Sequence, residues 1–441
     1  MIARPEKPPA APPGSLRAAL LAEESTVPTS TLGRLWRGGR SALGVGGALA
    51  KLRRGREVDP EAILALVGEF GELKGVAMKV GQMLGYLDEG IPAELRSALA
   101  VLQTAAPRSS ADEVAAVIRR SLGPAAEGLL AGMEREPIAV ASIGQVHRAR
   151  LPDGREVAVK IRHPGIDAAI KADFRAASIG KTLGAVIGGG AVPAMIDEAR
   201  QAFEEECDFS LEADRQRRFA AIFADDPEIV IPEVLAEWSG PEVLVSAWTP
   251  GRSFDELLAG DPPQAERDRI GAALFRVWMR SFYRDGLFHG DPHPGNFAFR
   301  SDGRVIVYDF GCVREVDPAL RRGFAALAAA TRADDREAMA AAITSVGGKA
   351  PRGEAGLADL RRLVRGFFGP LVTPGARRIA ADEGFEARSV LHDKRFLIGL
   401  RLPSRLLFLF RLRFGLYAVL ARLGAEVDWA ALEAAWAAEV R

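Results

Sequence analysis

The sequence predicts an α+β protein with a small strand-rich lobe and a larger helical lobe, preceded by a helical extension. Apolar residues recur at helical spacing from residue 60 to about residue 130 and again beyond residue 315. Between these stretches lie short strand-like runs joined by turn signatures. The 441 residues suffice for a two-lobed unit with an ample core, and 48% hydrophobic residues is too apolar for wholesale disorder.

Breaker and turn residues place the individual elements. Pro60 suits the first turn of a helix, and Pro152-Asp153-Gly154 is a turn that joins two strands into a hairpin. Ser301-Asp302-Gly303 predicts a second hairpin in the same way. The other elements are expected as helices over residues 60–88, 197–219, 262–284 and throughout the region beyond 315, and as strands near 229–234 and 242–248. The predicted regions are a disordered tail and basic arm (1–57), a helical extension (58–130), a strand-rich N-lobe (131–247) and a C-lobe with C-terminal helices (248–441).

Charge and cysteine content exclude several classes of function. Lys and Arg total 58 and Asp and Glu total 58, and this zero net charge argues against nucleic acid as a partner. Cys207 and Cys312 alone cannot build a disulfide framework or a structural zinc site. We therefore expect no disulfide-linked partner and a reducing, cytoplasmic compartment.

The sequence predicts contact with membranes only at their surface. The longest charge-free stretch, residues 182–196, is shorter than the roughly 20 apolar residues of a spanning helix. Arg411 and Arg413 interrupt the apolar stretch 406–420. The N-terminus lacks the apolar core of a signal peptide, so no export is expected. Residues 34–56 carry seven basic and no acidic side chains, which suits an arm on an anionic membrane surface. A solvated basic linker is the favoured alternative, because several glycines weaken a helix there.

The densest chemical signal is a loop of eight residues followed by a hairpin and the tripeptide Asp309-Phe310-Gly311. The loop reads His289-Gly290-Asp291-Pro292-His293-Pro294-Gly295-Asn296. This spacing is the layout of a kinase catalytic loop and metal-binding strand end. Oxygens of Asp309 and Asn296 suit Mg²⁺, and Asp291 can orient an attacking oxygen and accept its proton. The pattern predicts a kinase-type site for phosphoryl transfer with a bound Mg²⁺.

The two histidines of this loop allow a different interpretation. His289 and His293 could form a zinc site with Asp291, but no third strong ligand accompanies them. We therefore expect both histidines to order the loop instead.

A second signal is Lys160, at the end of the strand-like run Val157-Ala158-Val159-Lys160. A strand lysine that points into a cleft can bind phosphates as a point charge, and Glu212 in the following helix is the carboxylate expected to hold it. Upstream, the small residues of 139–146 allow close approach to phosphate, but Gly144 is the single glycine, so an ordinary G-x-G-x-x-G loop is missing. A Walker A loop is excluded too, because Arg175 stands where its first glycine belongs.

Together these residues resemble the UbiB/AarF-type atypical kinases, which are linked to coenzyme Q biosynthesis. Lys79-Val80-Gly81-Gln82 resembles the K-x-G-Q motif of that family. Residues 139–146 resemble its alanine-rich loop, with Val140 where alanine is usual, and Glu206-Cys207-Asp208 resembles its E-x-D motif. The resemblance covers roughly residues 60–320 and implies a protein-kinase-like two-lobed fold that uses ATP and Mg²⁺. It also implies a K-x-G-Q extension folded over the cleft, where a protein substrate would otherwise sit.

The resemblance also implies roles for individual residues. Lys79 is expected to pair with Glu206, in a motif set that consists of Lys79, Gly81, Gln82, Glu206 and Asp208. The expected catalytic residues are Asp291, Lys160 and Glu212, and the expected metal ligands are Asn296 and Asp309. The nucleotide-binding residues are expected to be Ala139, Ala141, Ser142, Ile143, Gly144, Val146, Lys160, Val245 and Ala247. Ala247 departs from the family, which often has an acidic residue in this presumptive hinge.

The leading hypothesis is therefore an ATP- and Mg²⁺-dependent atypical kinase or ATPase that supports isoprenoid-quinone or other lipid metabolism. Ordinary protein phosphorylation in trans is not expected, because no Ala-Pro-Glu motif follows Asp309-Phe310-Gly311. One alternative is a small-molecule phosphotransferase of the aminoglycoside or choline kinase type, which shares a similar loop but lacks the Lys79 motif. Another is a non-enzymatic, nucleotide-gated lipid-binding chaperone. The expected partners are a nucleotide and a lipid or anionic membrane surface.

Overall fold

The computed structural model describes residues 109–141, 143–168, 171, 200–201, 203–380, 400 and 404–440. The predicted tail, basic arm and helix 60–88 lie outside this range, and so do Lys79, Gly81, Gln82 and Ser142. The chain folds into two compact units. The N-terminal unit comprises Arg4–Leu211 and Leu235–Ser246, and the C-terminal unit comprises Met1–Ala3, Glu212–Val234 and Ala247–Arg441.

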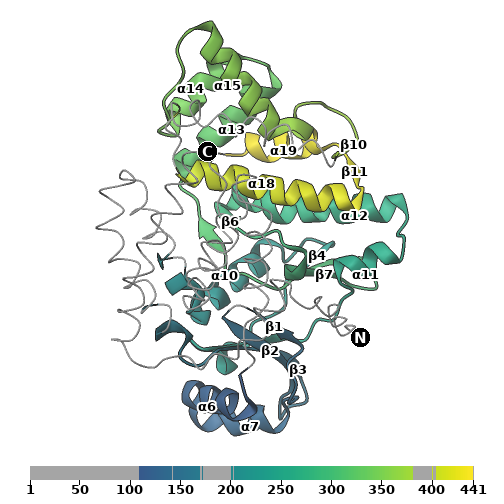
Figure 1. The fold of residues 1–441 in the computed structure, drawn as a ribbon. Coiled ribbons are helices and arrows are strands. Elements are labelled where there is room, and N and C mark those ends of the chain that lie inside the picture. Colours follow the sequence, from purple (N-terminus) through teal and green to yellow (C-terminus); the bar gives the residue numbers. More distant parts are fainter. Residues whose placement is uncertain are drawn as a thin grey trace, which may run out of the picture. The chain divides into compact units, whose positions relative to one another are not determined.

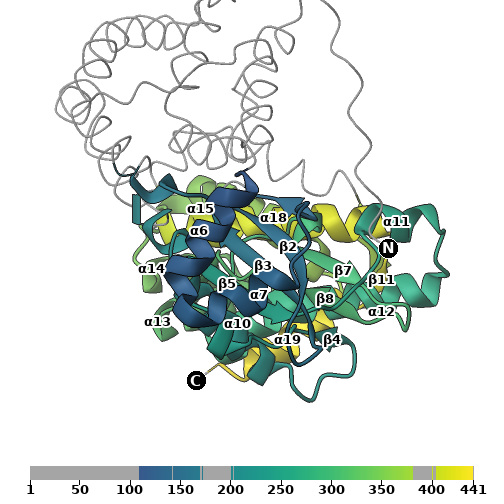
Figure 2. The ribbon, with the colours of Figure 1, turned by 90° about the horizontal axis from the view of Figure 1, so that it is seen from below.

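The N-terminal unit contains an antiparallel hairpin covered by two helices (Figure 2). β2 (Gly144–Arg150) pairs with β3 (Glu156–Arg162) from one end to the other, which confirms the predicted hairpin. The sheet order is β1-β2-β3-β5, with β1 at Ala139–Val140 and β5 at Val243–Ala247. Alternate residues of β3 are buried, as expected of a strand with one covered face. The helices are α6 (Ala111–Leu122) and α7 (Ala126–Ala131), joined by the 3₁₀ turn η1 (Gly123–Ala125).

The helix predicted over residues 197–219 is interrupted at the E-x-D tripeptide. Residues 203–206 are helical, residues 207 and 208 form a break, and α10 (Phe209–Ile222) begins anew. The break has a local cause, because a carboxylate oxygen of Asp208 accepts a hydrogen bond from the Ser210 N–H at 2.9 Å and thereby caps α10. The prediction of one continuous helix was wrong at this point.

The strands of the C-terminal unit are short and place the two chemical motifs side by side. β7 (Phe297–Phe299) and β8 (Val305–Val307) form the predicted second hairpin, and β4 (Ile229–Val230) pairs with β8 in parallel. A further ladder, not predicted, joins β6 (Leu287–His289) to β9 (Val313–Glu315). Because His289 lies opposite Val313, this ladder brings the start of the catalytic-type loop next to the end of the Asp309-Phe310-Gly311 segment.

Helices make up most of the C-terminal unit, and α18 lies along α12 (Figure 1). The predicted helix 262–284 is present as α12 (Gln264–Phe275) followed by the π-helical η3 (Arg276–Asp285). The other helices are α11 (Phe254–Ala259), α13 (Pro318–Arg332), α14 (Arg336–Ser345), α15 (Gly353–Phe368), α18 (Ser404–Leu423) and α19 (Trp429–Ala438). Single 3₁₀ turns of this unit are η4 (Pro294–Asn296) and η5 (Gly369–Leu371), and η2 (Ala236–Trp238) belongs to the N-terminal unit.

The region beyond residue 315 is not entirely helical, which corrects the prediction. β10 (Arg377–Arg378) and β11 (Glu426–Val427) form a two-residue antiparallel ladder, too short to produce a strand pattern in the sequence.

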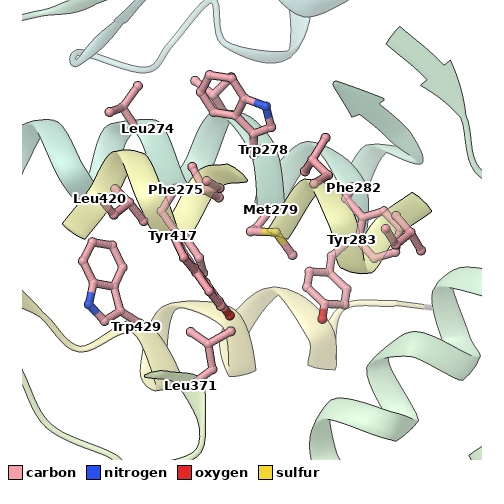
Figure 3. Close-up of a cluster of buried hydrophobic side chains, with 14 of the residues drawn as sticks. Leu274, Phe275, Trp278, Met279, Phe282, Tyr283, Leu371, Tyr417, Leu420 and Trp429 are labelled. Atoms are coloured by element: carbon pink, nitrogen blue, oxygen red, sulfur yellow. The ribbon is translucent and has the colours of Figure 1, made fainter. Parts of the chain in front are cut away.

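Aromatic and aliphatic side chains together form the core of the C-terminal unit (Figure 3). Phe275, Met279 and Tyr283 point toward the side of α12 and η3 where Tyr417 and Trp429 lie, whereas Trp278 points to the opposite side. Phe275 packs edge-on against Trp429 with ring centroids 5.3 Å apart. In the part of the chain that the structure describes, no helix combines the length and apolar character needed to cross a membrane.

Candidate functional site

Hydrogen bonds fix the carboxylate of Asp291 on both oxygens. The Nδ2 of Asn296 donates to Asp291 Oδ2 at 2.8 Å, and the His293 N–H donates to Oδ1 at 3.3 Å. Pro294 suits the first position of η4, the 3₁₀ turn that carries Asn296. The loop thus brings the predicted Asp291 and Asn296 together, and because the amide nitrogen of Asn296 faces Asp291, its oxygen remains as a possible metal ligand.

Asp309 is joined to this loop through its chain neighbour. The Tyr308 N–H donates to the Asn296 carbonyl oxygen at 2.9 Å, directly before Asp309. One carboxylate oxygen of Asp309 accepts the Gly311 N–H at 3.0 Å, which closes a tight turn at the end of β8. Burial raises the pKa of the Tyr308 phenol to about 12, so its hydroxyl is protonated and can donate.

His289 connects the two motifs and orders the loop. Its Nε2 lies 2.7 Å from the Asp309 carbonyl oxygen, and its Nδ1 accepts the Asp291 N–H at 3.3 Å. One neutral tautomer satisfies both contacts, with the proton on Nε2. Burial lowers the pKa of His289, which favours this neutral form. Since both ring nitrogens are engaged, a zinc site on His289, His293 and Asp291 would require breaking these bonds.

α10 places a buried carboxylate beside the Asp309 turn. The side chain of Glu212 is buried. A Cβ added at Gly311 would lie 3.4 Å from Asp309 Oδ1 and 3.7 Å from a Glu212 carboxylate oxygen. One turn further along α10, Arg215 donates from its guanidinium to the Gly311 carbonyl oxygen at 2.9 Å. Glu212 and Asp309 therefore lie at one turn of the C-terminal unit, and hydrogen bonds of Tyr308 and His289 connect this turn to the loop that carries Asp291 and Asn296.

These groups fit a magnesium ion. Mg²⁺ prefers hard oxygen ligands and is commonly held by one or two protein oxygens, with phosphate and water oxygens completing an octahedron. The carboxylate of Asp309 and the amide oxygen of Asn296 are such ligands.

In the N-terminal unit, the alanine-rich loop forms a narrow hairpin. Ala139 pairs with Val146, and the Ala141 N–H donates to the Gly144 carbonyl oxygen at 2.8 Å. Ala139 and Ala141 are exposed, whereas Ile143 and Gly144 are buried. A Cβ at Gly144 would lie 2.4 Å from the Ile161 carbonyl oxygen. The close approach of β3 therefore requires a glycine at this position, whether or not a phosphate binds nearby.

Lys160 and the presumptive hinge also have protein contacts. Lys160 lies opposite Val146 in the sheet. Its ammonium nitrogen lies 5.2 Å from the centroid of the Phe209 ring. The Val245 N–H donates to Ser239 Oγ at 3.0 Å, and the Ala247 N–H donates to the Glu233 carbonyl oxygen at 2.8 Å. The N–H groups of both predicted hinge residues are thus engaged within the chain.

The E-x-D tripeptide is held by an arginine that the sequence analysis missed. Arg162 donates to the Cys207 carbonyl oxygen and, at 2.7 Å, to the carboxylate of Glu242. Arg120 of α6 donates to both oxygens of the same carboxylate at 2.8 Å. Arg162 follows Lys160 by two residues, so both extend from the same face of β3. This two-residue spacing in a strand is the sequence pattern that could have indicated Arg162. Burial raises the pKa of the Cys207 thiol to about 11, which suits a structural cysteine without a redox role.

The fold and these motifs define a protein-kinase-like protein. A strand-rich unit carries the hairpin with Lys160, and a helical unit carries the Asp291–Asn296 loop and the Asp309-Phe310-Gly311 turn. The model of the ABC1 atypical kinase-like domain matches residues 101–343. The chain belongs to the ABC1 atypical kinase-like family, which confirms the resemblance to UbiB-type kinases and the kinase-like fold. The matched range begins after Lys79 and Gln82, whose roles stay predictions.

Curated relatives carry related names. The chain is 30% identical over 302 residues to the chloroplastic protein ACTIVITY OF BC1 COMPLEX KINASE 8 of Arabidopsis thaliana, covering 66% of this chain and 39% of that protein. It is 28% identical over 307 residues to the mitochondrial atypical kinase COQ8 of Saccharomyces cerevisiae, covering 66% and 61%. The chain thus spans less than two thirds of the length of these two relatives.

A solved structure shares the fold over most of its length. The complex of Rv3197 with erythromycin from Mycobacterium tuberculosis matches with a TM-score of 0.62 and 31% sequence identity, covering 82% of this chain and 92% of that one.

Proposed function

We propose that the chain binds ATP with Mg²⁺ and acts as an atypical kinase or ATPase that supports isoprenoid-quinone or other lipid metabolism. The single observation that carries the proposal is the hydrogen-bonded connection between the loop with Asp291 and Asn296 and the turn where Asp309 and Glu212 lie. The similarity to an atypical kinase named COQ8 supports it, as does the resemblance to kinases linked to coenzyme Q.

Each of these residues has a proposed chemical role. Asp309 and Asn296 bind Mg²⁺, which when bound neutralises charge on the phosphate oxygens. Asp291, whose carboxylate is held on both oxygens, orients the attacking hydroxyl or water and accepts its proton. Lys160 binds phosphate oxygens, and Glu212 supports this cation and the metal site.

The remaining predicted residues keep their proposed roles. The alanine-rich loop, with Ala139, Ala141, Ser142, Ile143, Gly144 and Val146, lies along the nucleotide, and Val245 and Ala247 border the base. Lys79, Gly81 and Gln82 of the extension act with Glu206 and Asp208 to restrict access of a protein substrate. The basic arm is proposed to meet an anionic membrane surface.

Phosphate release from ATP tests this proposal. We expect turnover that requires Mg²⁺, rises with anionic liposomes and is lost in Asp309→Asn. Asp302→Asn is the matched control, because Asp302 lies in the turn of the same hairpin and its carboxylate contacts Arg304, away from the metal-binding residues. Unchanged Mg²⁺-dependent turnover in Asp309→Asn would contradict the metal assignment.

The same assay separates the alternatives. Nucleotide binding without phosphate release by the native protein would favour the nucleotide-gated lipid-binding chaperone. Stimulation by small hydroxyl compounds, with no response to liposomes, would favour a small-molecule phosphotransferase.

A further inference from the structure

Tyr308 bonds to two different segments of the C-terminal unit and precedes Asp309 in the chain. Its backbone N–H donates to the Asn296 carbonyl oxygen at 2.9 Å. Its hydroxyl donates to the Thr249 carbonyl oxygen at 2.7 Å, across 59 residues of sequence. One residue therefore contacts the segment after β5 and both segments that carry the proposed metal ligands.

The segment around Thr249 is attached firmly to the β7–β8 hairpin. Arg252 and Phe299 exchange two backbone hydrogen bonds, of 2.8 and 2.9 Å. A Cβ at Gly251 would lie 2.8 Å from Ile306 Cδ1 and 2.9 Å from Ala298 Cβ, so the backbone at this glycine packs directly on both strands. Asn296 and Asp309 flank the same hairpin. Residues 249–252 and the proposed metal ligands are thus both attached to the β7–β8 hairpin.

The N–H of Thr249 is a backbone hydrogen-bond donor in this segment. The N–H groups of Val245 and Ala247 are engaged by Ser239 and Glu233. Thr249 donates with its hydroxyl to the Ala247 carbonyl oxygen at 3.2 Å and accepts the Tyr308 hydroxyl with its own carbonyl. Among the hydrogen bonds of the described residues, none has the Thr249 N–H as its donor. A planar base with ring-nitrogen acceptors needs a donor of this kind.

We propose that Tyr308 is a positioning residue. Its hydroxyl holds the Thr249 carbonyl, in the peptide to Pro250, and so limits the backbone rotation of Thr249, whose own N–H recognises the nucleotide base at a set distance from Asn296 and Asp309. The inference rests on the proposed function, since it names how the same site recognises its nucleotide. Without the hydroxyl, the Thr249 carbonyl loses the hydrogen bond that limits the backbone rotation of this residue, while the backbone bond from Tyr308 to Asn296 is retained.

The variant Tyr308→Phe tests this role, because it removes one oxygen and keeps the ring. Binding of Mg-ATP and of Mg-tripolyphosphate, which has phosphates but no base, is measured by calorimetry on the full chain. We expect the affinity for ATP to fall about two- to tenfold, the worth of one hydrogen bond, with the affinity for tripolyphosphate unchanged. The control is Tyr417→Phe, since the hydroxyl of Tyr417 bonds to Arg413 in the helical core and its loss should leave the ratio of the two affinities unchanged.

The outcomes distinguish this inference from the proposed function. If Tyr308→Phe weakens both ligands equally, or weakens neither, the positioning role is wrong while nucleotide binding stands. If the native protein binds neither ligand, the proposed function fails and the inference fails with it.

Discussion

Two clusters of arginine and glutamate, one in each unit, differ in how far they are removed from water. In the C-terminal unit, the side chains of Arg413 and Glu433 are 1% and 0% exposed and form an ion pair. In the N-terminal unit, the side chains of Arg162 and Glu242 are 13% and 19% exposed, and Arg120 at 56% completes that cluster. The difference in burial indicates that the two arginine–glutamate clusters have different structural roles.

The buried cluster is surrounded by groups that stabilise its charges. Arg413 donates to Tyr417 at 2.6 Å, and Tyr283 donates to Glu433 at 2.6 Å. The Arg413 guanidinium also lies 4.4 Å from the Phe368 ring centroid. Burial raises the pKa of Tyr283 well above its usual value, so its hydroxyl remains a donor. Arg413 in the apolar stretch 406–420 thus belongs to the packed core that joins α18 to α19 and η3.

The half-exposed cluster, which consists of Arg120, Arg162 and Glu242, instead contacts a backbone carbonyl group. Arg162 contacts the carbonyl of Cys207, the central residue of the E-x-D tripeptide. The Phe209 N–H donates to the Pro241 carbonyl oxygen at 3.0 Å, next to Glu242. The cluster therefore fixes the turn that carries Glu206 and Asp208, and we expect its loss to affect activity more than stability.

Breaking the buried pair should have the largest effect. In Glu433→Gln, Arg413 keeps its charge without a matching carboxylate in a dry core, and such losses cost about 3–5 kcal/mol of unfolding free energy. Urea unfolding followed by far-UV circular dichroism measures it. The control is Arg361→Gln, whose ion pair with Asp334 is partly exposed and should contribute at most about 1 kcal/mol. Equal unfolding midpoints for the two variants would refute the distinction drawn between buried and exposed pairs.

Removing Arg162 should affect activity. In Arg162→Met, the Cys207 carbonyl loses its guanidinium donor, and displacement of Glu206 and Asp208 should lower kcat/KM for ATP about 10- to 100-fold, as small misplacements at a reacting site do. Arg120→Met is the control, because it leaves the bond from Arg162 to Cys207 in place. A comparable loss of kcat/KM in both variants would assign the effect to Glu242 and not to the turn.

How far apart two contacting residues lie in the sequence explains which contacts the sequence could predict. Asp291, Asn296 and Asp309 lie within one short stretch whose spacing and turns are local, so their proximity was predictable. Arg162 and Glu242 are 80 residues apart, and Tyr308 and Thr249 are 59 apart, so no local period could pair them. The β6–β9 ladder has three residues in each strand, which is too short to show alternation. The cap at Asp208 was predictable in principle, since Asp is a favoured residue at helix starts.

The smallest effect concerns a buried histidine of the N-terminal unit, His147. His147 Nδ1 lies 2.8 Å from the Glu134 carbonyl oxygen, and its Nε2 lies 2.8 Å from the side-chain nitrogen of Gln145. Gln145 in turn accepts the Ser109 N–H with its amide oxygen at 3.1 Å. The proton of His147 must therefore sit on Nδ1, because Nε2 accepts from the amide nitrogen of Gln145.

Acid should destabilise this arrangement. Burial lowers the pKa of His147 below its usual 6.5, so on acidification the unfolded chain takes up a proton before the folded one does. The stability that the neutral ring contributes is complete above about pH 6.5 and falls by at most about 1.4 kcal/mol per pH unit as the pH drops below that value. We expect urea unfolding between pH 7.5 and 5.5 to show this loss, and His147→Gln, which cannot titrate, to show a shallower one. The same slope in both proteins would mean that His147 titrates alike in the folded and unfolded chain, and that its burial does not hold it neutral.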